Sequence, residues 1–187
     1  TMDSWLVYCM TKGQVFRTDF SNASRTQLFD IGRLTWSDDV CRAFGIDRRA
    51  LPEVTDSNGF YGKTDFDGIL PEAIPIHAVF GDSHAALFRQ ACHHPGMAKA
   101  TYGTGSSVMM NIGDKPVYSQ HGLVTSLAWS LSGKATYVLE GNINYTGAAI
   151  TWLKDDLQLI RSPEETMALA QAANPKDRSY FVPAFTG

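Results

Sequence analysis

The pattern of hydrophobic and polar positions divides this chain into a first part of short mixed elements and a second part dominated by strands. Apolar positions at helical spacing predict an opening helix over Thr1 to Met10, with Trp5, Leu6 and Cys9 sharing one apolar face. The stretch from Asp19 to Thr26 is small and polar, which predicts a loop.

Strand patterns fill the region after Ile74. Four extended segments are predicted, at Met97 to Tyr102, Ser107 to Ile112, Leu123 to Leu131 and Ala135 to Glu140. Ser132-Gly133 predicts a hairpin turn between the last two, and a helix is predicted to begin at Gly147. Strands followed by helices indicate an α+β or mixed α/β protein.

Two turns interrupt this pattern at places where chemistry could occur. The apolar run from Ile76 to Phe80 predicts a short strand that ends at Gly81-Asp82, after which Ser83 to Phe88 predicts a helix. Further along, Gly103-Thr104-Gly105 predicts a glycine turn between two strands.

Asp82 is the first candidate functional residue. A carboxylate at the end of a strand, on the turn into a helix, is held by backbone on both sides and suits a general base. The alternative is a structural helix cap, in which Asp82 accepts hydrogen bonds from the amides of His84 or Ala85. The residues alone leave both interpretations open.

The turn Gly103-Thr104-Gly105 is the second candidate site. Glycines permit positive φ and let successive backbone N–H groups form a concave nest that binds phosphate. The alternative is an ordinary hairpin turn without a ligand.

Composition and missing motifs narrow the function classes. Hydrophobic residues make up 44% of the chain, charged residues 19%, and the net charge is −3, which gives no reason to expect nucleic acid or an anionic membrane as a partner. No apolar run reaches the ~20 residues that cross a bilayer. The three cysteines form no CxxC pair, which indicates a reduced cytoplasmic protein without a zinc site. Walker, dinucleotide-binding and protein-kinase motifs are absent from the sequence.

A family resemblance connects the two turns. Gly81 to Phe88 and Gly96 to Gly105 resemble the FGGY carbohydrate kinases, and most of all their glycerol-kinase-like members. Other segments resemble the family in the same order, at Asp3 to Leu6, Thr18 to Thr26, Leu51 to Val54, Leu139 to Gly141, Gly147 to Leu153 and Val182 to Gly187.

The resemblance implies an α/β fold of the actin-like ATPase, ribonuclease-H-like type, with two domains and an active site between them. Residues 1–81 would be the C-terminal part of the family's N-terminal, substrate-binding domain, and residues 82–187 the N-terminal part of its C-terminal, nucleotide-binding domain. We therefore expect a central fragment of a longer enzyme, which alone would not be a competent kinase.

The resemblance also implies residue roles. Asp82 would take the proton from the acceptor hydroxyl as it attacks the γ-phosphate of ATP, with Ser83 beside it in the substrate site. The nucleotide-binding positions would be Gly103, Thr104, Gly105, Gly147 and Thr151. Mg²⁺ would bridge the phosphates and be held mainly through water, so no protein metal ligand is expected.

The resemblance does not identify the acceptor. Glycerol kinases usually carry glutamine at the positions of Ser83 and Thr151, so the small-molecule partner could be glycerol, a ketopentose or a related sugar or polyol. We expect a cytoplasmic homo-oligomer without nucleic-acid or membrane partners. Two competing hypotheses are a non-catalytic sugar- or nucleotide-binding module on the same fold and an antiparallel carbohydrate-binding sandwich.

Overall fold

The computed structural model describes residues 1–185, and residues 186–187, the end of the segment Val182 to Gly187, lie outside the described part. The helices are α1 (Met2–Met10), α2 (Phe20–Ala23), α3 (Asp38–Ala43), η1 (Arg48–Ala50), α4 (Asp82–Arg89), α5 (Gly147–Thr151), η2 (Trp152–Asp156) and α6 (Glu165–Ala172). The strands are β1 (Arg17–Asp19), β2 (Phe29–Asp30), β3 (Thr35–Trp36), β4 (Glu53–Thr55), β5 (Lys63–Thr64), β6 (Ile74–Pro75), β7 (Ala98–Tyr102), β8 (Ser106–Gly113), β9 (Val124–Leu131) and β10 (Lys134–Ile143).

Two compact units make up the chain. The first contains residues 1–99 and 109–140, and the second contains residues 100–108 and the chain from Gly141 onward. The first holds the N-terminal elements, α4, all of β9 and most of β10, and the second holds the β7–β8 turn, α5 and α6.

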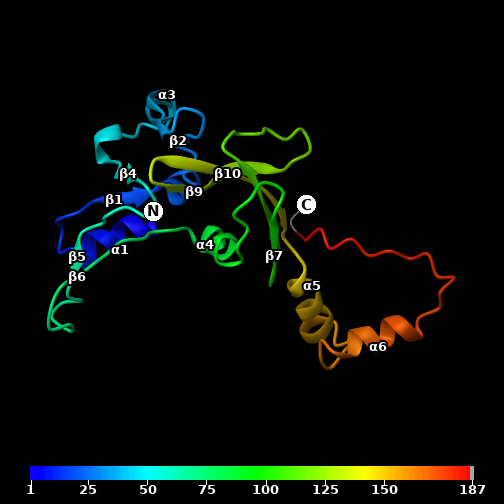
Figure 1. Ribbon diagram of the computed structural model, residues 1–187. Coiled ribbons are helices and arrows are strands. Elements are labelled where there is room, and N and C mark those ends of the chain that lie inside the picture. Colours follow the sequence, from blue (N-terminus) through cyan, green and yellow to red (C-terminus); the bar gives the residue numbers. More distant parts are fainter. Residues whose placement is uncertain (186–187) are drawn as a thin grey trace. The chain divides into compact units, whose positions relative to one another are not determined.

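A four-stranded sheet in the order β7-β8-β10-β9 confirms the four predicted extended segments. Its β9–β10 hairpin is antiparallel, with Lys134 opposite Leu131 (Figure 1). Both turn residues are left-handed, with φ of 51° at Ser132 and 77° at Gly133. Two successive left-handed residues match the twist of a tight hairpin, so the predicted turn is also confirmed.

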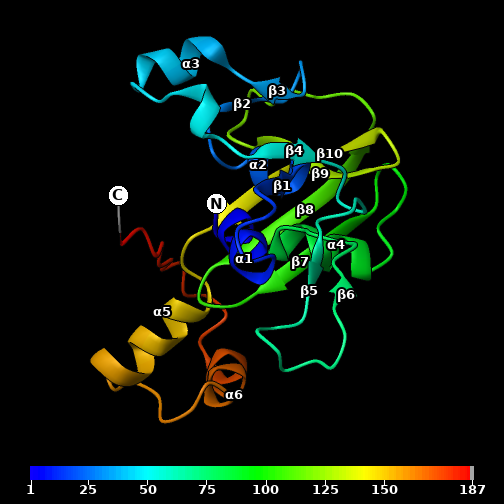
Figure 2. The same ribbon diagram turned by 90° about the vertical axis from the view of Figure 1, so that its left-hand side faces the viewer.

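Both faces of the β9–β10 hairpin are buried within the first unit. On one face, Leu87 of α4 packs in a core with Cys92, Met109, Ala128, Trp129 and Val138. On the other face, Ala23 of α2 packs with Phe29, Trp36, Leu127 and Tyr137. Helices α2 and α4 both contact β9, and Figure 2 shows α2 beside this strand. This hairpin is therefore the support on which both helices are placed.

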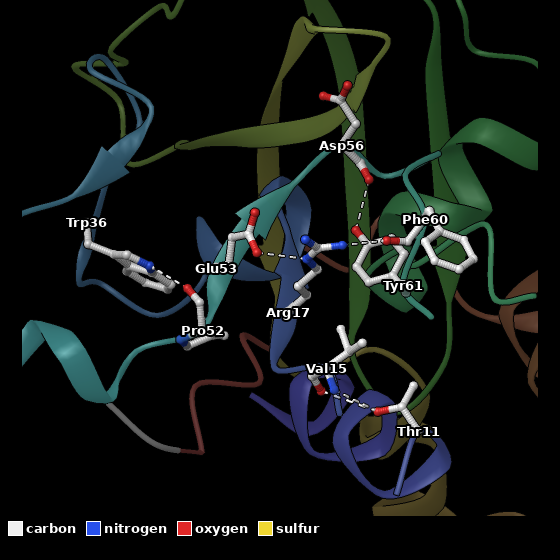
Figure 3. Close-up of polar contacts among 9 residues, drawn as sticks. All are labelled: Thr11, Val15, Arg17, Trp36, Pro52, Glu53, Asp56, Phe60 and Tyr61. Carbon is white, nitrogen blue, oxygen red and sulfur yellow. Dashed lines mark hydrogen bonds and ion pairs between the residues drawn. The ribbon is translucent and has the colours of Figure 1, made fainter. Parts of the chain in front are cut away.

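The N-terminal strands are joined by parallel pairing and by side-chain bonds. β1 pairs with β4 in parallel register, Arg17 opposite Glu53. The Arg17 guanidinium donates to the Glu53 carboxylate at 2.8 Å and to the Phe60 carbonyl at 2.9 Å (Figure 3). The Tyr61 hydroxyl, on a fully buried side chain, donates to the Asp56 carbonyl at 2.9 Å. These bonds hold the chain after β4 against β1.

The opening helix is confirmed, but its predicted apolar face is wrong. Ser4 and Val7 are the buried residues of α1, whereas Trp5 is 60% exposed, Leu6 is 50% exposed, and Cys9 is also exposed. A helix turns 100° per residue, so the face that contains Ser4 and Val7 also contains Thr11, which is buried. Burial here follows the neighbours of the helix and not its most apolar residues.

Two local predictions near the candidate site are also wrong. The stretch predicted as a loop contains the end of β1 and helix α2, which the side chain of Asp19 caps by accepting from the amides of Ser21 and Asn22. Residues 76–80 are not a strand; they are joined to residues 57–62 by isolated backbone bonds, such as Val79 N–H to the Ser57 carbonyl at 3.0 Å.

No helix among the described residues is long and apolar enough to cross a membrane. Cys9, Cys41 and Cys92 are all free thiols.

Candidate active site

The turn into α4 places Asp82 at the first position of the helix and not at its cap. Gly81 is the N-cap, and its carbonyl accepts from the Ala85 amide at 2.8 Å. The Asp82 carboxylate is exposed and accepts from the Ser83 amide at 2.6 Å. The capping alternative, with bonds from His84 or Ala85, is therefore wrong. A negative charge at this position is favoured by the helix dipole.

A cavity of about 460 Å³ opens beside this turn. All of its lining residues belong to the first unit, and they come from α1, from the segment around α2, from the turn and from β10. They are Met2, Asp3, Leu6, Asn22, Arg25, Phe80, Gly81, Asp82, Ser83, His84 and Glu140. The structure thus brings both predicted substrate-site residues, Asp82 and Ser83, to one concave surface.

An ion pair that the sequence analysis did not assign to the site lines the same cavity. Arg25 and Glu140 lie 2.8 Å apart, and the Glu140 side chain is only 7% exposed, whereas that of Arg25 is 42% exposed. A buried carboxylate needs a nearby cation or several donors. A glutamate that follows the buried pair Tyr137-Val138 in a strand is the sequence signal that could have identified this pair.

His84 and Lys99 are buried near these charges. Burial lowers the pKa of His84 to about 4, the positive charge of Arg25 adds to this shift, and the His84 Nε2 atom lies 3.4 Å from the Ser126 hydroxyl. The ring is therefore neutral at pH 7. Burial also lowers the pKa of Lys99, while the negative charges of Glu140 and Asp82 oppose that shift.

The second candidate site lies within the second unit, where the β7–β8 turn meets the start of α5. The Gly147 amide donates to the Gly103 carbonyl at 2.9 Å, and the amides of Thr146 and Ala148 donate to the Thr104 carbonyl at 3.1 and 3.0 Å. The Thr146 hydroxyl is also 2.7 Å from that of Ser106. Gly103-Thr104-Gly105 and Gly147 are therefore in direct contact.

Glycine is required at two positions of this contact. A Cβ atom on Gly147 would lie 2.5 Å from the Gly103 carbonyl oxygen, and one on Gly105 would lie 2.9 Å from the Ile143 carbonyl oxygen. Both distances are impossible without backbone movement. Close packing between two backbone segments thus explains these glycines without a ligand.

The remaining predicted nucleotide-site residues are accessible. Thr104 is exposed at the tip of the turn, and Thr151 is exposed on α5, where its hydroxyl donates to the Gly147 carbonyl at 3.2 Å. The amides of Gly103, Gly147 and Ala148 each donate to a backbone carbonyl of the turn, so these three N–H groups are already engaged.

The chain matches two family models that together cover most of its length. Residues 1–89 match the N-terminal domain of the FGGY family of carbohydrate kinases, and residues 98–187 match the C-terminal domain of that family.

Similar full-length proteins are glycerol kinases. That of Alkaliphilus metalliredigens is 49% identical over 187 residues, which is 100% of this chain and 37% of that protein. That of Francisella tularensis subsp. novicida is 47% identical over the same length and covers the same shares. The chain therefore spans little more than a third of the curated relatives that it matches.

Solved structures of carbohydrate kinases are also similar to this chain. The crystal structure of Plasmodium falciparum glycerol kinase with ADP matches 92% of this chain and 35% of that chain, with a TM-score of 0.84 and 35% identity. The ligand-bound xylulose kinase of Lactobacillus acidophilus matches the same shares with a TM-score of 0.77 and 17% identity, which indicates a shared fold alone.

Proposed function

Because this chain belongs to the FGGY family of carbohydrate kinases, we propose that the protein that carries it transfers a phosphoryl group from ATP to a hydroxyl group of a small polyol or sugar. The observation that carries this proposal is the match of the entire chain to glycerol kinases at 47–49% identity. Family membership also confirms the predicted fold class, because the solved structures that match are FGGY kinases, which have the actin-like ATPase fold.

Glycerol is the acceptor that we propose to test first. The relatives at 47–49% identity are glycerol kinases, whereas the matching xylulose and gluconate kinase structures are only 17–18% identical. Ser83 is shorter than the glutamine expected from the resemblance, so a ketopentose or another larger acceptor belongs in the same substrate panel.

Asp82 is the proposed general base. Its carboxylate is exposed at the helix start and lines the 460 Å³ cavity, where an acceptor hydroxyl could approach it. A carboxylate is a weak base at neutral pH, so its contribution would come from placing the nucleophile and from its charge, as is general for phosphoryl transfer. Ser83, on the same cavity, would contact the acceptor.

The nucleotide would contact Gly103, Thr104, Gly105, Gly147 and Thr151. The similar glycerol kinase structure contains ADP, which supports ATP as the donor. Residues 1–185 contain no group of three or more His, Cys, Asp or Glu side chains that could hold a metal ion. We therefore propose that Mg²⁺ binds through the phosphates and water, a mode that suits its slow dehydration.

The remaining proposals concern the whole protein. We propose a division at Gly81/Asp82, where α4 begins, with residues 1–81 in the substrate-binding domain and residues 82–187 in the nucleotide-binding domain. We also propose that the enzyme is cytoplasmic, forms a homo-oligomer and acts on small molecules. The three free thiols are compatible with a reducing compartment.

The test is Asp82→Asn in a full-length enzyme that carries this chain. With glycerol, ketopentoses and other polyols as acceptors, the variant should lose about 100-fold or more in kcat, because the amide cannot accept the proton, while ATP binding stays within threefold. Asp114→Asn, also at an exposed position, is the matched control and should keep full turnover. A wild-type enzyme that binds ligands but phosphorylates none of the acceptors would instead support the non-catalytic binding module.

A further inference from the structure

A fully buried carboxylate lies behind the Gly81-Asp82 turn. Asp19 is 0% exposed and accepts hydrogen bonds from five donors. They are the Ser21 amide and hydroxyl, the Asn22 amide and side-chain nitrogen, and the Ser57 hydroxyl, at 2.7 to 3.1 Å. So many donors hold the carboxylate in one orientation and offset the cost of burying its charge.

The Ser21 hydroxyl connects this carboxylate to the turn. It lies 2.7 Å from Asp19 Oδ2 and 2.8 Å from the Gly81 backbone nitrogen. A hydroxyl has one proton to donate, and a backbone N–H group can only donate. The Ser21 proton therefore points to Asp19, and a lone pair of the same oxygen receives the Gly81 N–H. Asp19 thus fixes the rotation of the Ser21 hydroxyl.

Gly81 is held on several sides. Ser21 binds its N–H group, the Ala85 amide binds its carbonyl, and a Cβ atom on Gly81 would lie 2.8 Å from His84 Nδ1. Since His84 is only 4% exposed, its ring has little space in which to move. The backbone just before Asp82 therefore has one well-defined position, and the carboxylate of Asp82 leaves the helix from that position.

Ser57 is a control residue that distinguishes an effect on the position of the Gly81 turn from an effect on the stability of the fold. It is also 0% exposed, and its hydroxyl donates to the same Asp19 oxygen at 2.7 Å. Its oxygen, however, accepts from the Ser130 amide at 3.2 Å on β9, and not from the turn. Two equally buried serines thus donate to the same carboxylate, but their hydroxyl oxygens accept from different parts of the first unit.

We propose that Ser21, with Asp19 behind it, is a positioning residue that sets the Gly81 peptide and so aims the Asp82 carboxylate into the cavity. This inference rests on the proposed function of Asp82, and it adds a residue to that site from a segment expected to be a loop. Ser21 acts through Gly81 and is not among the residues that line the cavity.

Kinetics of Ser21→Ala and Ser57→Ala test this in a full-length enzyme that carries this chain, with ATP and its best acceptor. Ser21→Ala should lower kcat by about tenfold or more, since displacement of a positioned group slows the chemical step, with the KM for ATP within twofold. Ser57→Ala should keep kcat within threefold. Both variants lose one buried hydroxyl, so both should unfold at lower urea concentration. Equal kcat values for the two variants would overturn the proposal.

Hydrogen exchange gives a second readout that does not depend on turnover. The amide of Gly81 should exchange faster in Ser21→Ala than in Ser57→Ala, and unchanged exchange at Gly81 would also overturn the proposal. If the wild-type enzyme phosphorylates nothing, the proposed function fails while the exchange result still decides the role of Ser21. If the alanine variants do not fold, Ser21→Cys and Ser57→Cys replace them, because a thiol keeps a side chain in place but is a weak acceptor.

Discussion

At the scale of single residues, Gly81 leaves no room for a methyl group. Gly81→Ala would place a carbon 2.8 Å from the buried His84 ring. We expect a loss of about 1–3 kcal/mol in the free energy of unfolding, as for other overpacked sites. Activity should also fall, because the turn that carries Asp82 must move. Urea denaturation and steady-state kinetics measure both effects.

Gly32→Ala is the control for this change. Gly32 is likewise outside the left-handed region, and a methyl group added to it would have an Asp30 carboxylate oxygen as its nearest neighbour, at an ordinary contact distance of 3.4 Å. A comparable loss in Gly32→Ala would mean that the cost arises from replacing glycine and not from crowding at the turn.

His84 makes stability depend on pH. Its pKa is about 4 in the folded protein because of burial, with a further lowering by Arg25 and opposing effects of Asp19, Glu140 and Asp82. An unfolded histidine has a pKa of about 6.5. Between these values only the unfolded state binds the proton, so stability is fully present above pH ~6.5 and falls as the pH decreases toward 4. The expected loss is up to ~3 kcal/mol.

Urea denaturation between pH 4 and 7 measures this loss, and His84→Gln should flatten the pH dependence. All other groups are the same in both proteins, so the difference between the two curves reports on His84. Parallel curves would show that His84 does not carry the dependence.

Two candidate site residues are exposed, whereas the buried face of the first helix differs from the prediction. Asp82 and Thr104 are both exposed and therefore accessible to a ligand, and their proposed roles stay predictions. The apolar face predicted for α1 is wrong, because a serine and a valine are buried while Trp5 is exposed. Which face of a short helix is buried depends on its partners, and these are not visible in the local pattern.

At the scale of elements, the contact between the β7–β8 turn and α5 depends on Gly147. Gly147→Ala would force its methyl group against the Gly103 carbonyl oxygen, 2.5 Å away, and would separate the turn from the helix. If this turn binds phosphate, the KM for ATP should rise by about tenfold, equivalent to ~1.4 kcal/mol of binding. The KM for the acceptor should stay within twofold.

Isothermal titration with ADP checks the same prediction without turnover. Gly32→Ala, in the other unit, serves as the control and should leave nucleotide affinity unchanged. Unaltered ADP affinity in Gly147→Ala would remove the turn from the nucleotide site and leave the hairpin interpretation.

The strands of the sheet are the elements that the sequence predicts best. Extended segments separated by a Ser-Gly turn are local signals, and β9 and β10 form where these signals predict them. Residues 19–26 are predicted poorly because α2 depends on Asp19, which is held in turn by Ser57, 38 residues away. In the local sequence pattern, a helix cap that depends on a distant partner looks the same as a polar loop.

At the scale of the whole molecule, Asp19 joins three distant parts of the first unit. Through Ser57 it is connected to Ser130, and through Ser21 to Gly81. Asp19→Asn would turn an amide group toward buried donors, so we expect a loss of about 3 kcal/mol or more in the free energy of unfolding. Chemical denaturation of the full-length enzyme measures it. Asp39→Asn, at a side chain that is 88% exposed, should cost almost nothing.

Family and fold follow from the sequence because ordered motifs extend over nearly the whole chain, from Asp3 to Gly187. The cavity beside Asp82 cannot be predicted from the sequence, because its walls come from α1, from the segment around α2 and from β10. Arg25 and Glu140 lie 115 positions apart in the sequence and meet only in the folded unit. Residue spacing cannot show such a pair.

The bond between Ser21 and Gly81 also bears on the order of folding. It closes a segment of 60 residues, and the entropy lost in such a closure must be offset by other long-range contacts formed at the same time. The turn that carries Asp82 should therefore become ordered late, after α2 and the β9–β10 hairpin have packed. In refolding experiments we expect helical circular dichroism to return before protection of the Gly81 amide, so that an early compact state would still lack a correctly aimed carboxylate.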